Sequence, residues 1–103
     1  MSSSVQEKQK ELGRLCESFS VKQLDIFGSA ADETGTLPDA SDIDFLVEFL
    51  PLKEDQYADV YFGLLFALEE LFGRSVDLVM TQAIRNPYFR ESVERSRKLL
   101  YAA

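Results

Sequence analysis

The run from Ile43 to Phe49 restricts the fold most, because it alternates apolar and other residues as an extended strand does. Ile43, Phe45, Val47 and Phe49 recur at every second position and therefore lie on one face. Pro51 ends the strand, because proline has no N–H for a sheet ladder. A short strand with one apolar face is stable only in a sheet packed against another layer.

The remaining apolar patterns predict two further strands and three helices. Leu24 and Ile26 alternate with polar neighbours before Gly28, and a capping-box spacing joins Ser4 to Glu7. The predicted strands are 23–27, 43–49 and 75–80, and the predicted helices are 5–19, 57–72 and 87 to about 100, the last with Asn86 as its N-cap. This order of helix, strand, strand, helix, strand and helix predicts an α/β fold, with a small mixed β-sheet backed by helices.

Length and composition exclude several classes of protein. The 103 residues suit one domain, 1–103, and the 46% hydrophobic content indicates a folded chain. With 18 acidic and 11 basic residues, the net charge of −7 argues against binding bulk nucleic acid. The longest apolar run, 60–68, is too short for a membrane span, and 1–13 does not resemble a signal peptide. We therefore expect a cytoplasmic protein.

The residue types available limit the chemistry. There is no histidine, and Cys16 is the only cysteine. Catalysis through Ser-His-Asp or Cys-His groups, zinc sites and intrachain disulfides are therefore excluded. Any catalysis must use carboxylates, hydroxyls, Lys or Arg, and Cys16 is expected only to pack among apolar neighbours.

Two aspartates open the second predicted strand. Asp42 and Asp44 are two positions apart, so their side chains leave the same face with α-carbons about 7 Å apart. Two carboxylates on one face can converge on a divalent metal, and hard oxygen ligands suit magnesium. The alternative is that Asp42 only ends the preceding loop and Asp44 is a solvated strand position.

Two further features accompany this pair. Asp77 stands among Val76, Leu78 and Met80, where a carboxylate is costly to bury unless it is paired or binds a cation. The alternative places Asp77 outward on an alternating strand. Gly28-Ser29 directly follows a strand, where glycine allows a phosphate to approach the backbone and serine adds a hydroxyl. An ordinary turn is the alternative for that pair.

The ordered combination resembles the DNA polymerase beta nucleotidyltransferase superfamily, and at this length its minimal nucleotidyltransferase (MNT) group. Phe-Gly-Ser, Ser-Asp-Ile-Asp and Val-Asp-Leu occur in this order, and the resemblance covers about residues 21–101. It implies a palm-like nucleotidyltransferase fold and transfer of a nucleoside monophosphate from a triphosphate, with ATP as the expected donor.

The resemblance also implies roles for individual residues. Gly28 and Ser29 hold the triphosphate, Asp42 and Asp44 bind the metal, with two magnesium ions expected, and Asp77 completes the site and helps to deprotonate the attacking hydroxyl. These three aspartates are thus the expected catalytic and metal-binding residues.

Minimal members of this group resemble the antitoxin of a toxin–antitoxin pair whose partner is a helical HEPN ribonuclease. The resemblance implies transfer of AMP to a tyrosine hydroxyl of that partner. Residues 30–41 contain no Arg or Lys, although relatives often carry a basic residue after Gly-Ser, which favours an alternative. That alternative is a non-catalytic module that silences a helical partner by binding alone. A third hypothesis is a structural or interaction domain with solvated aspartates.

Overall fold

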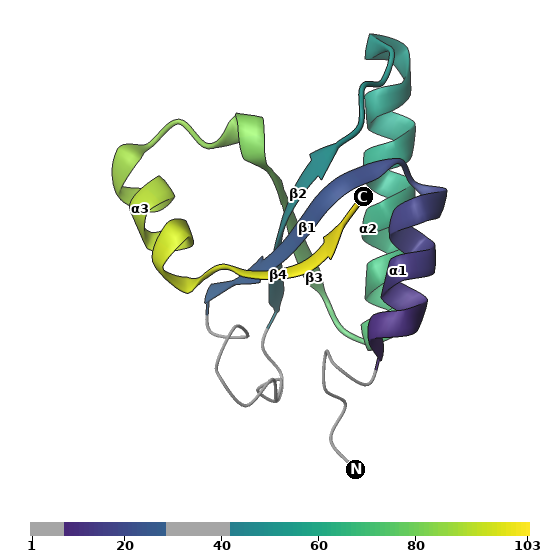
Figure 1. The fold of residues 1–103 in the computed structure, drawn as a ribbon, viewed down its shortest axis with the longest axis horizontal. Helices are drawn as coiled ribbons and strands as arrows, with labels where there is room; N and C mark the ends of the chain where they lie inside the picture. Colours follow the sequence, from purple (N-terminus) through teal and green to yellow (C-terminus); the bar gives the residue numbers. More distant parts are fainter. Residues whose placement is uncertain (1–7, 29–41) are drawn as a thin grey trace.

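The computed structural model describes residues 8–28 and 42–103, which form one mixed sheet with helices on both faces (Figure 1). The strands occur in the spatial order β3-β2-β1-β4. β1 is antiparallel to β2 and β4, whereas β2 and β3 are parallel. The elements are α1 (Gln9–Ser18), β1 (Val21–Phe27), β2 (Ile43–Phe49), η3 (Glu54–Gln56), α2 (Tyr57–Phe72), β3 (Val76–Met80), η4 (Thr81–Ala83), α3 (Pro87–Ser96) and β4 (Lys98–Ala102).

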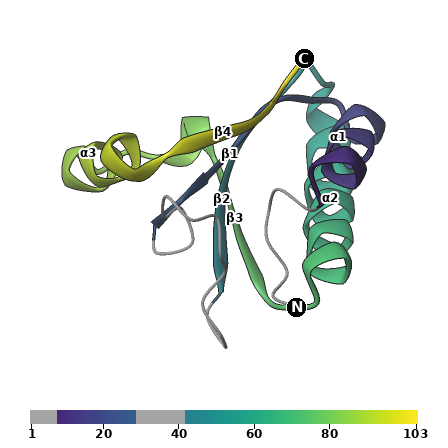
Figure 2. The ribbon, with the colours of Figure 1, turned by 60° about the horizontal axis from the view of Figure 1, so that its bottom comes forward.

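Two apolar clusters hold the layers together. α1 and α2 cover one face of the sheet and α3 lies on the opposite side, as Figure 2 shows. The main cluster, between the sheet and α1 and α2, includes the fully buried Phe45, Leu64 and Leu68. A smaller cluster on the α3 side joins Phe27, Leu46, Ile84 and Val93. The sheet thus has one fully covered face and one partly covered face.

The structure confirms the predicted second strand and second helix. β2 spans Ile43–Phe49 and α2 spans Tyr57–Phe72, with the predicted bounds. Gly73 ends α2 in the left-handed conformation, φ 66°, and its N–H donates to the Glu69 carbonyl. Among the described helices, none combines the length and apolarity needed to cross a membrane.

The predicted start of the last helix is confirmed, but its predicted end is wrong. The Asn86 side chain caps α3 by accepting from the N–H groups of Tyr88 and Phe89. The helix ends at Ser96 instead of continuing to Leu100, because Arg97 is extended (ψ 140°) and the chain continues as β4. β4 pairs with the edge of β1, which supplies hydrogen-bond partners that a local pattern does not reveal.

Three other boundaries differ from prediction. β1 begins at Val21, two residues early, because Val21 is buried and pairs with Phe49. β3 begins at Val76 instead of Ser75. α1 ends at Ser18, one residue before the predicted end at 19. It begins at Gln9 in the described residues, whereas the predicted helix start and its capping box fall in residues 1–7, outside them.

Cys16 packs in the main cluster, as predicted. Its side chain is fully buried, and burial raises the pKa of the thiol to about 12. Because the thiolate is the reactive form, full burial and the raised pKa are those of a cysteine that contributes to packing.

Candidate active site

Two of the three predicted metal-binding aspartates stand side by side on neighbouring strands. Asp44 of β2 is in register with Asp77 of β3, and paired strands lie about 4.8 Å apart. Val76, Leu78 and Met80 pack against the main cluster. Asp77 alternates with them and therefore points to the α3 side of the sheet, where Asp44 also lies.

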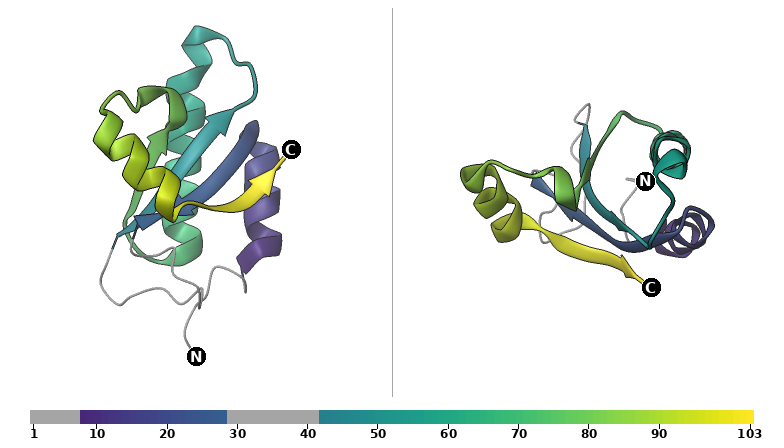
Figure 3. Two further views of the ribbon diagram at one scale, coloured as in Figure 1. Left: turned by 60° about the vertical axis from the view of Figure 1, so that its left-hand side comes forward. Right: turned by 90° about the horizontal axis from the view of Figure 1, so that it is seen from above.

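The connection between β2 and β3 accounts for this register. α2 returns the chain to the end of the sheet where β2 begins, so that β3 starts there as well (Figure 3). The Ile43 N–H donates to the Ser75 carbonyl at 3.1 Å. The Val76 N–H donates to a Glu69 side-chain oxygen at 3.1 Å, and the Tyr61 hydroxyl donates to the Leu78 carbonyl at 2.5 Å. The first bond joins the start of β2 to the residue before β3, and the other two tie α2 to β3, so that Asp77 is held level with Asp44.

Asp77 is exposed. The sequence left two alternatives for this carboxylate, a paired or cation-bound position and an outward-facing one, and its side chain faces outward. In the part of the chain that the structure describes, the buried acid is Asp25 of β1, which is 2% exposed. An isolated charge in an apolar strand thus corresponds to a buried ion pair at Asp25 and to an open carboxylate at Asp77.

Asp42 lies just before β2, is exposed, and acts electrostatically on Asp44. Burial raises the pKa of the Asp44 carboxyl, and the negative charges of Asp77 and then Asp42 raise it further. The three carboxylates therefore form one local concentration of negative charge. A bound cation would relieve this repulsion.

The donor chemistry of these residues suits a divalent cation. Carboxylate oxygens are the ligands that magnesium prefers, and Asp44 and Asp77 are in register on the same side of the sheet. Within residues 8–28 and 42–103, however, no three acidic, cysteine or histidine side chains are arranged to hold one metal ion together. The aspartates therefore have the right ligand type for a divalent cation and lie close together, but their side chains are not arranged as a complete coordination shell.

Gly28 lies directly against Asp44. Its φ is +74°, in the left-handed region that favours glycine. A Cβ atom at this position would lie 2.7 Å from Oδ2 of Asp44, closer than real Cβ contacts allow. Ser29 and the loop 30–41 fall outside the described residues, so of the predicted phosphate-binding pair the structure places Gly28.

Residues 96 and 97, at the junction of α3 and β4, were not identified from sequence. The Arg97 Nε donates to Oδ2 of Asp25 at 2.5 Å, and Gln23 donates to the other carboxylate oxygen at 3.0 Å. The Ser96 Oγ accepts the Gly28 N–H at 3.0 Å. The signal for Asp25 was available, because it is the one charge among Leu24, Ile26 and Phe27. The contacts of 96 and 97 were hidden by the prediction of a longer helix.

A groove between α1 and α2 lies away from these groups. It is lined by residues that include Lys8, Arg14, Leu15 and Leu71. Since α1 and α2 cover the face opposite to Asp44 and Asp77, this groove contributes nothing to the candidate site.

We expect Asp44→Asn to stabilise the metal-free protein at pH 7. Because its pKa is raised on folding, the folded state binds the Asp44 proton more tightly than the unfolded chain does. Ionised Asp44 therefore lowers the free energy of unfolding at any pH above the raised pKa of the folded protein. This destabilisation disappears as the pH falls below 3.8, the ordinary pKa of an aspartate, because the carboxyl is then protonated in both states. Urea unfolding in the presence of a chelator should show a higher midpoint for Asp44→Asn at pH 7 and no gain at about pH 3.

The matched control is Asp59→Asn, which neutralises an exposed carboxylate on α2. Its midpoint should not rise, because Asp59 lies in the first turn of α2, where the helix dipole favours a negative charge. A lower midpoint for Asp44→Asn than for the unchanged protein at pH 7 would contradict the repulsion inferred here.

The fold and the aspartate cluster define a nucleotidyltransferase. The sequence matches the nucleotidyltransferase domain family over residues 8–100, and the chain belongs to this family. A candidate protein adenylyltransferase of Methanocaldococcus jannaschii is 44% identical over 80 residues, which are 78% of this chain and 76% of that relative.

Solved structures agree with this assignment. A candidate minimal nucleotidyltransferase superposes with a TM-score of 0.71 at 30% identity, covering 91% of this chain and 90% of that one. A chain from the complex of a tri-AMPylated Shewanella oneidensis HEPN toxin with its MNT antitoxin has a TM-score of 0.64 at 19% identity. The match covers 96% of this chain and 73% of that one. At that identity, the second match concerns the fold alone. The predicted fold class and the predicted family are confirmed.

Proposed function

We propose that this nucleotidyltransferase transfers AMP from ATP to a tyrosine hydroxyl of a helical HEPN-type partner, with magnesium bound at Asp42, Asp44 and Asp77. The observation that carries the proposal is the register of Asp44 with Asp77 beside Gly28, at one end of the sheet. The adenylyltransferase relative supports AMP and a protein acceptor. The matched fold in an AMPylated HEPN toxin complex supports the class of partner.

Asp42 and Asp44 are the residues that would hold the metal, with Asp77 completing the ligand set. When bound, magnesium offsets the charge of the triphosphate and polarises the phosphorus that is attacked. Gly28 presents a backbone without a side chain beside Asp44, which leaves room for the phosphates.

In the proposed reaction, the acceptor oxygen forms a bond to the α-phosphorus of ATP. The bond between the α-phosphorus and the oxygen that bridges it to the β-phosphorus breaks. Pyrophosphate leaves. The hydroxyl proton passes to the exposed Asp77 carboxylate, whose position at the surface lets an acceptor approach. A protein acceptor suits this geometry, because Asp42 is exposed as well and both carboxylates face outward from the sheet.

Binding without catalysis is the second candidate function. The observation that favours it is the composition of the segment 30–41, which contains Asp32 and Glu33 but no Arg or Lys. Acidic residues repel a triphosphate unless a cation lies between them. The two functions are distinguished by an assay for metal-dependent transfer of AMP, which only the catalytic function would show.

The test is to add the purified chain, magnesium and ATP labelled at the α-phosphate to an extract of the source cells. We expect label on a tyrosine of a helical protein, identified by mass spectrometry, and no label when Asp44→Asn replaces the unchanged chain. Label on another class of acceptor would retain the transferase and refute the HEPN tyrosine. A partner that copurifies and is silenced with no gain in mass would establish binding alone.

A further inference from the structure

We infer that Ser96 is a positioning residue, which holds Gly28 against the Asp44 carboxylate and thereby controls nucleotide affinity. The inference rests on the proposed function for its effect on ATP, whereas the contact between Ser96 and Gly28 can be tested without it. Ser96 is the last residue of α3, and it contacts Gly28, which directly follows β1 and lies 68 positions earlier in the sequence.

The Ser96 hydroxyl makes two hydrogen bonds that fix its orientation. Its oxygen accepts the Gly28 N–H at 3.0 Å, and the hydroxyl donates to the Ser92 carbonyl one turn earlier at 3.2 Å. Since a hydroxyl has one proton to donate, the bond to Ser92 directs its lone pairs toward Gly28. The Gly28 N–H therefore has a defined partner.

The end of α3 is itself held in place against β1. Arg97, next to Ser96, pairs with the buried Asp25 carboxylate at 2.5 Å and with Glu94 at 2.7 Å. On the same side of the sheet, the rings of Phe27 and Phe89 meet edge to face with centroids 6.0 Å apart. These contacts hold α3 against β1 both before and after Ser96, at Phe89 and Arg97, so Ser96 cannot move away freely.

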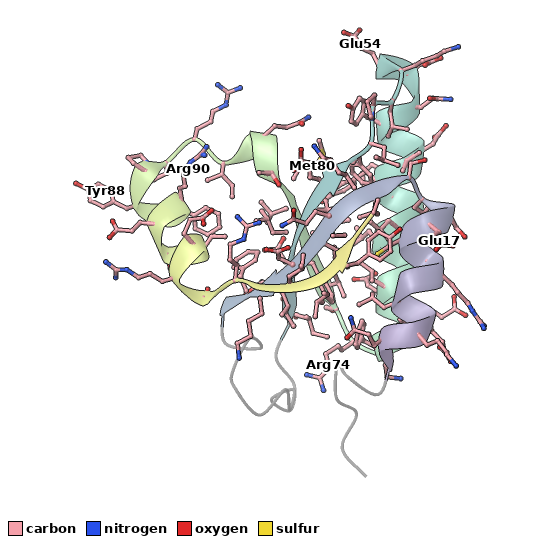
Figure 4. The ribbon with its side chains drawn as sticks, viewed as in Figure 1. Glu17, Glu54, Arg74, Met80, Tyr88 and Arg90 are labelled. Atoms are coloured by element: carbon pink, nitrogen blue, oxygen red, sulfur yellow. The ribbon has the colours of Figure 1, made fainter. Side chains whose placement is uncertain are left out.

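The remainder of α3 adds to this attachment. Arg90 lies on the side of the helix that faces the sheet, while Tyr88 points away from it (Figure 4). The Arg90 guanidinium donates to the Ile84 carbonyl at 2.7 Å, and Tyr88 is 82% exposed. The Arg90 bond therefore fixes α3 to the segment that precedes it, and Ser96 is the last residue of this helix.

This arrangement changes what Gly28 contributes. Its N–H already donates to Ser96, so in this structure the amide is not directed at a phosphate. What Gly28 provides is its left-handed backbone and the space next to Asp44, where a Cβ would come within 2.7 Å of Oδ2. With so little clearance, a displacement of Gly28 by a fraction of an ångström alters the space between this turn and the carboxylate.

The test compares Ser96→Ala with Ser96→Thr, which keeps the hydroxyl, and with Ser92→Ala, which removes an exposed hydroxyl one turn away. Two quantities are measured on the full chain. The first is the hydrogen-exchange rate of the Gly28 amide by NMR. The second is the dissociation constant for ATP with magnesium, together with KM and kcat for transfer.

We expect Ser96→Ala to speed exchange at Gly28 by about tenfold, as loss of one hydrogen bond allows. The dissociation constant and KM for ATP should rise about threefold to tenfold while kcat changes little. Ser96→Thr should restore both quantities, and Ser92→Ala should leave both unchanged. If Ser96→Ala does not fold, Ser96→Cys keeps the size with a weaker acceptor and takes its place.

Equal acceleration of all core amides by Ser96→Ala would overturn the inference, since it would indicate a general loss of stability. Unchanged exchange at Gly28 would overturn it as well. If the unchanged protein does not bind ATP, the proposed function fails, and exchange at Gly28 still decides whether Ser96 positions the turn.

Discussion

Asp44→Asn should lower the rate of AMP transfer at least about a thousandfold, which corresponds to about 4 kcal/mol of lost transition-state stabilisation. Asparagine keeps the size of the side chain and removes the charge of the carboxylate that stands between Asp42 and Asp77. The measurement is transfer of labelled AMP under single-turnover conditions, so that the chemical step is observed. Loss of activity should accompany a gain in stability of the metal-free protein, which separates a lost ligand from a damaged fold.

The neighbouring aspartates extend this prediction. Asp42→Asn should abolish transfer and weaken magnesium-dependent binding of ATP, whereas Asp77→Asn should spare more binding than turnover because its proposed role includes accepting the proton. Asp59→Asn on α2 is the control, since it removes an exposed carboxylate from the opposite side of the sheet and should retain full activity. Full activity in any of the three variants Asp42→Asn, Asp44→Asn and Asp77→Asn would refute the metal assignment.

Gly28→Ala should reduce transfer about a hundredfold, because displacements of about 1 Å at a reacting centre cost that much. The added Cβ would lie 2.7 Å from Oδ2 of Asp44, so either the carboxylate or the turn must move. We expect weaker binding of ATP with magnesium by calorimetry as well, and a larger loss with the bulkier Gly28→Val. Ser29→Ala should cost less, since it removes one hydroxyl and adds no atoms.

Gly73→Ala provides a matched control for the strain of the backbone. Gly73 also has a left-handed φ, +66°, but a Cβ there meets nothing within 4 Å. Both alanine variants should lose about 1–2 kcal/mol of stability from the conformation itself. Only Gly28→Ala should lose activity, and equal ATP affinities for Gly28→Ala and Gly73→Ala would remove this turn from the site.

Local sequence patterns predicted those elements whose stability comes mainly from one apolar face. β2 and α2 have their predicted bounds, because alternation and a helical stripe ending at Gly73 are complete within the segments themselves. α3 begins as predicted because Asn86 and Pro87 form a local cap. β4 was not predicted, since a strand that completes a sheet depends on the partner edge provided by β1.

In the candidate site, too, some features could be predicted from local sequence and others depend on tertiary contacts. The pair Asp42 and Asp44 could be identified from sequence because two positions in a strand share a face. Two observations belong to the structure: the register of Asp44 with Asp77, and the exposure of Asp77, which the sequence left open. An isolated charge in an apolar strand is compatible with a buried ion pair or an open carboxylate, and only the covering layer distinguishes them. α3 and Arg97 cover Asp25, while Asp77 remains open.

The sequence by itself determined the residue types that are available for chemistry, the α/β class, and the order of glycine turn, paired aspartates and third aspartate. The absence of histidine and the presence of one cysteine left carboxylates as the main candidates for catalysis. Only the tertiary structure decided which side chains meet. The Ser96 hydroxyl reaches Gly28 and the Arg97 guanidinium reaches Asp25 because β4 pairs with β1, a contact between segments about 70 positions apart. Such pairings depend on how layers pack, and no local periodicity encodes them.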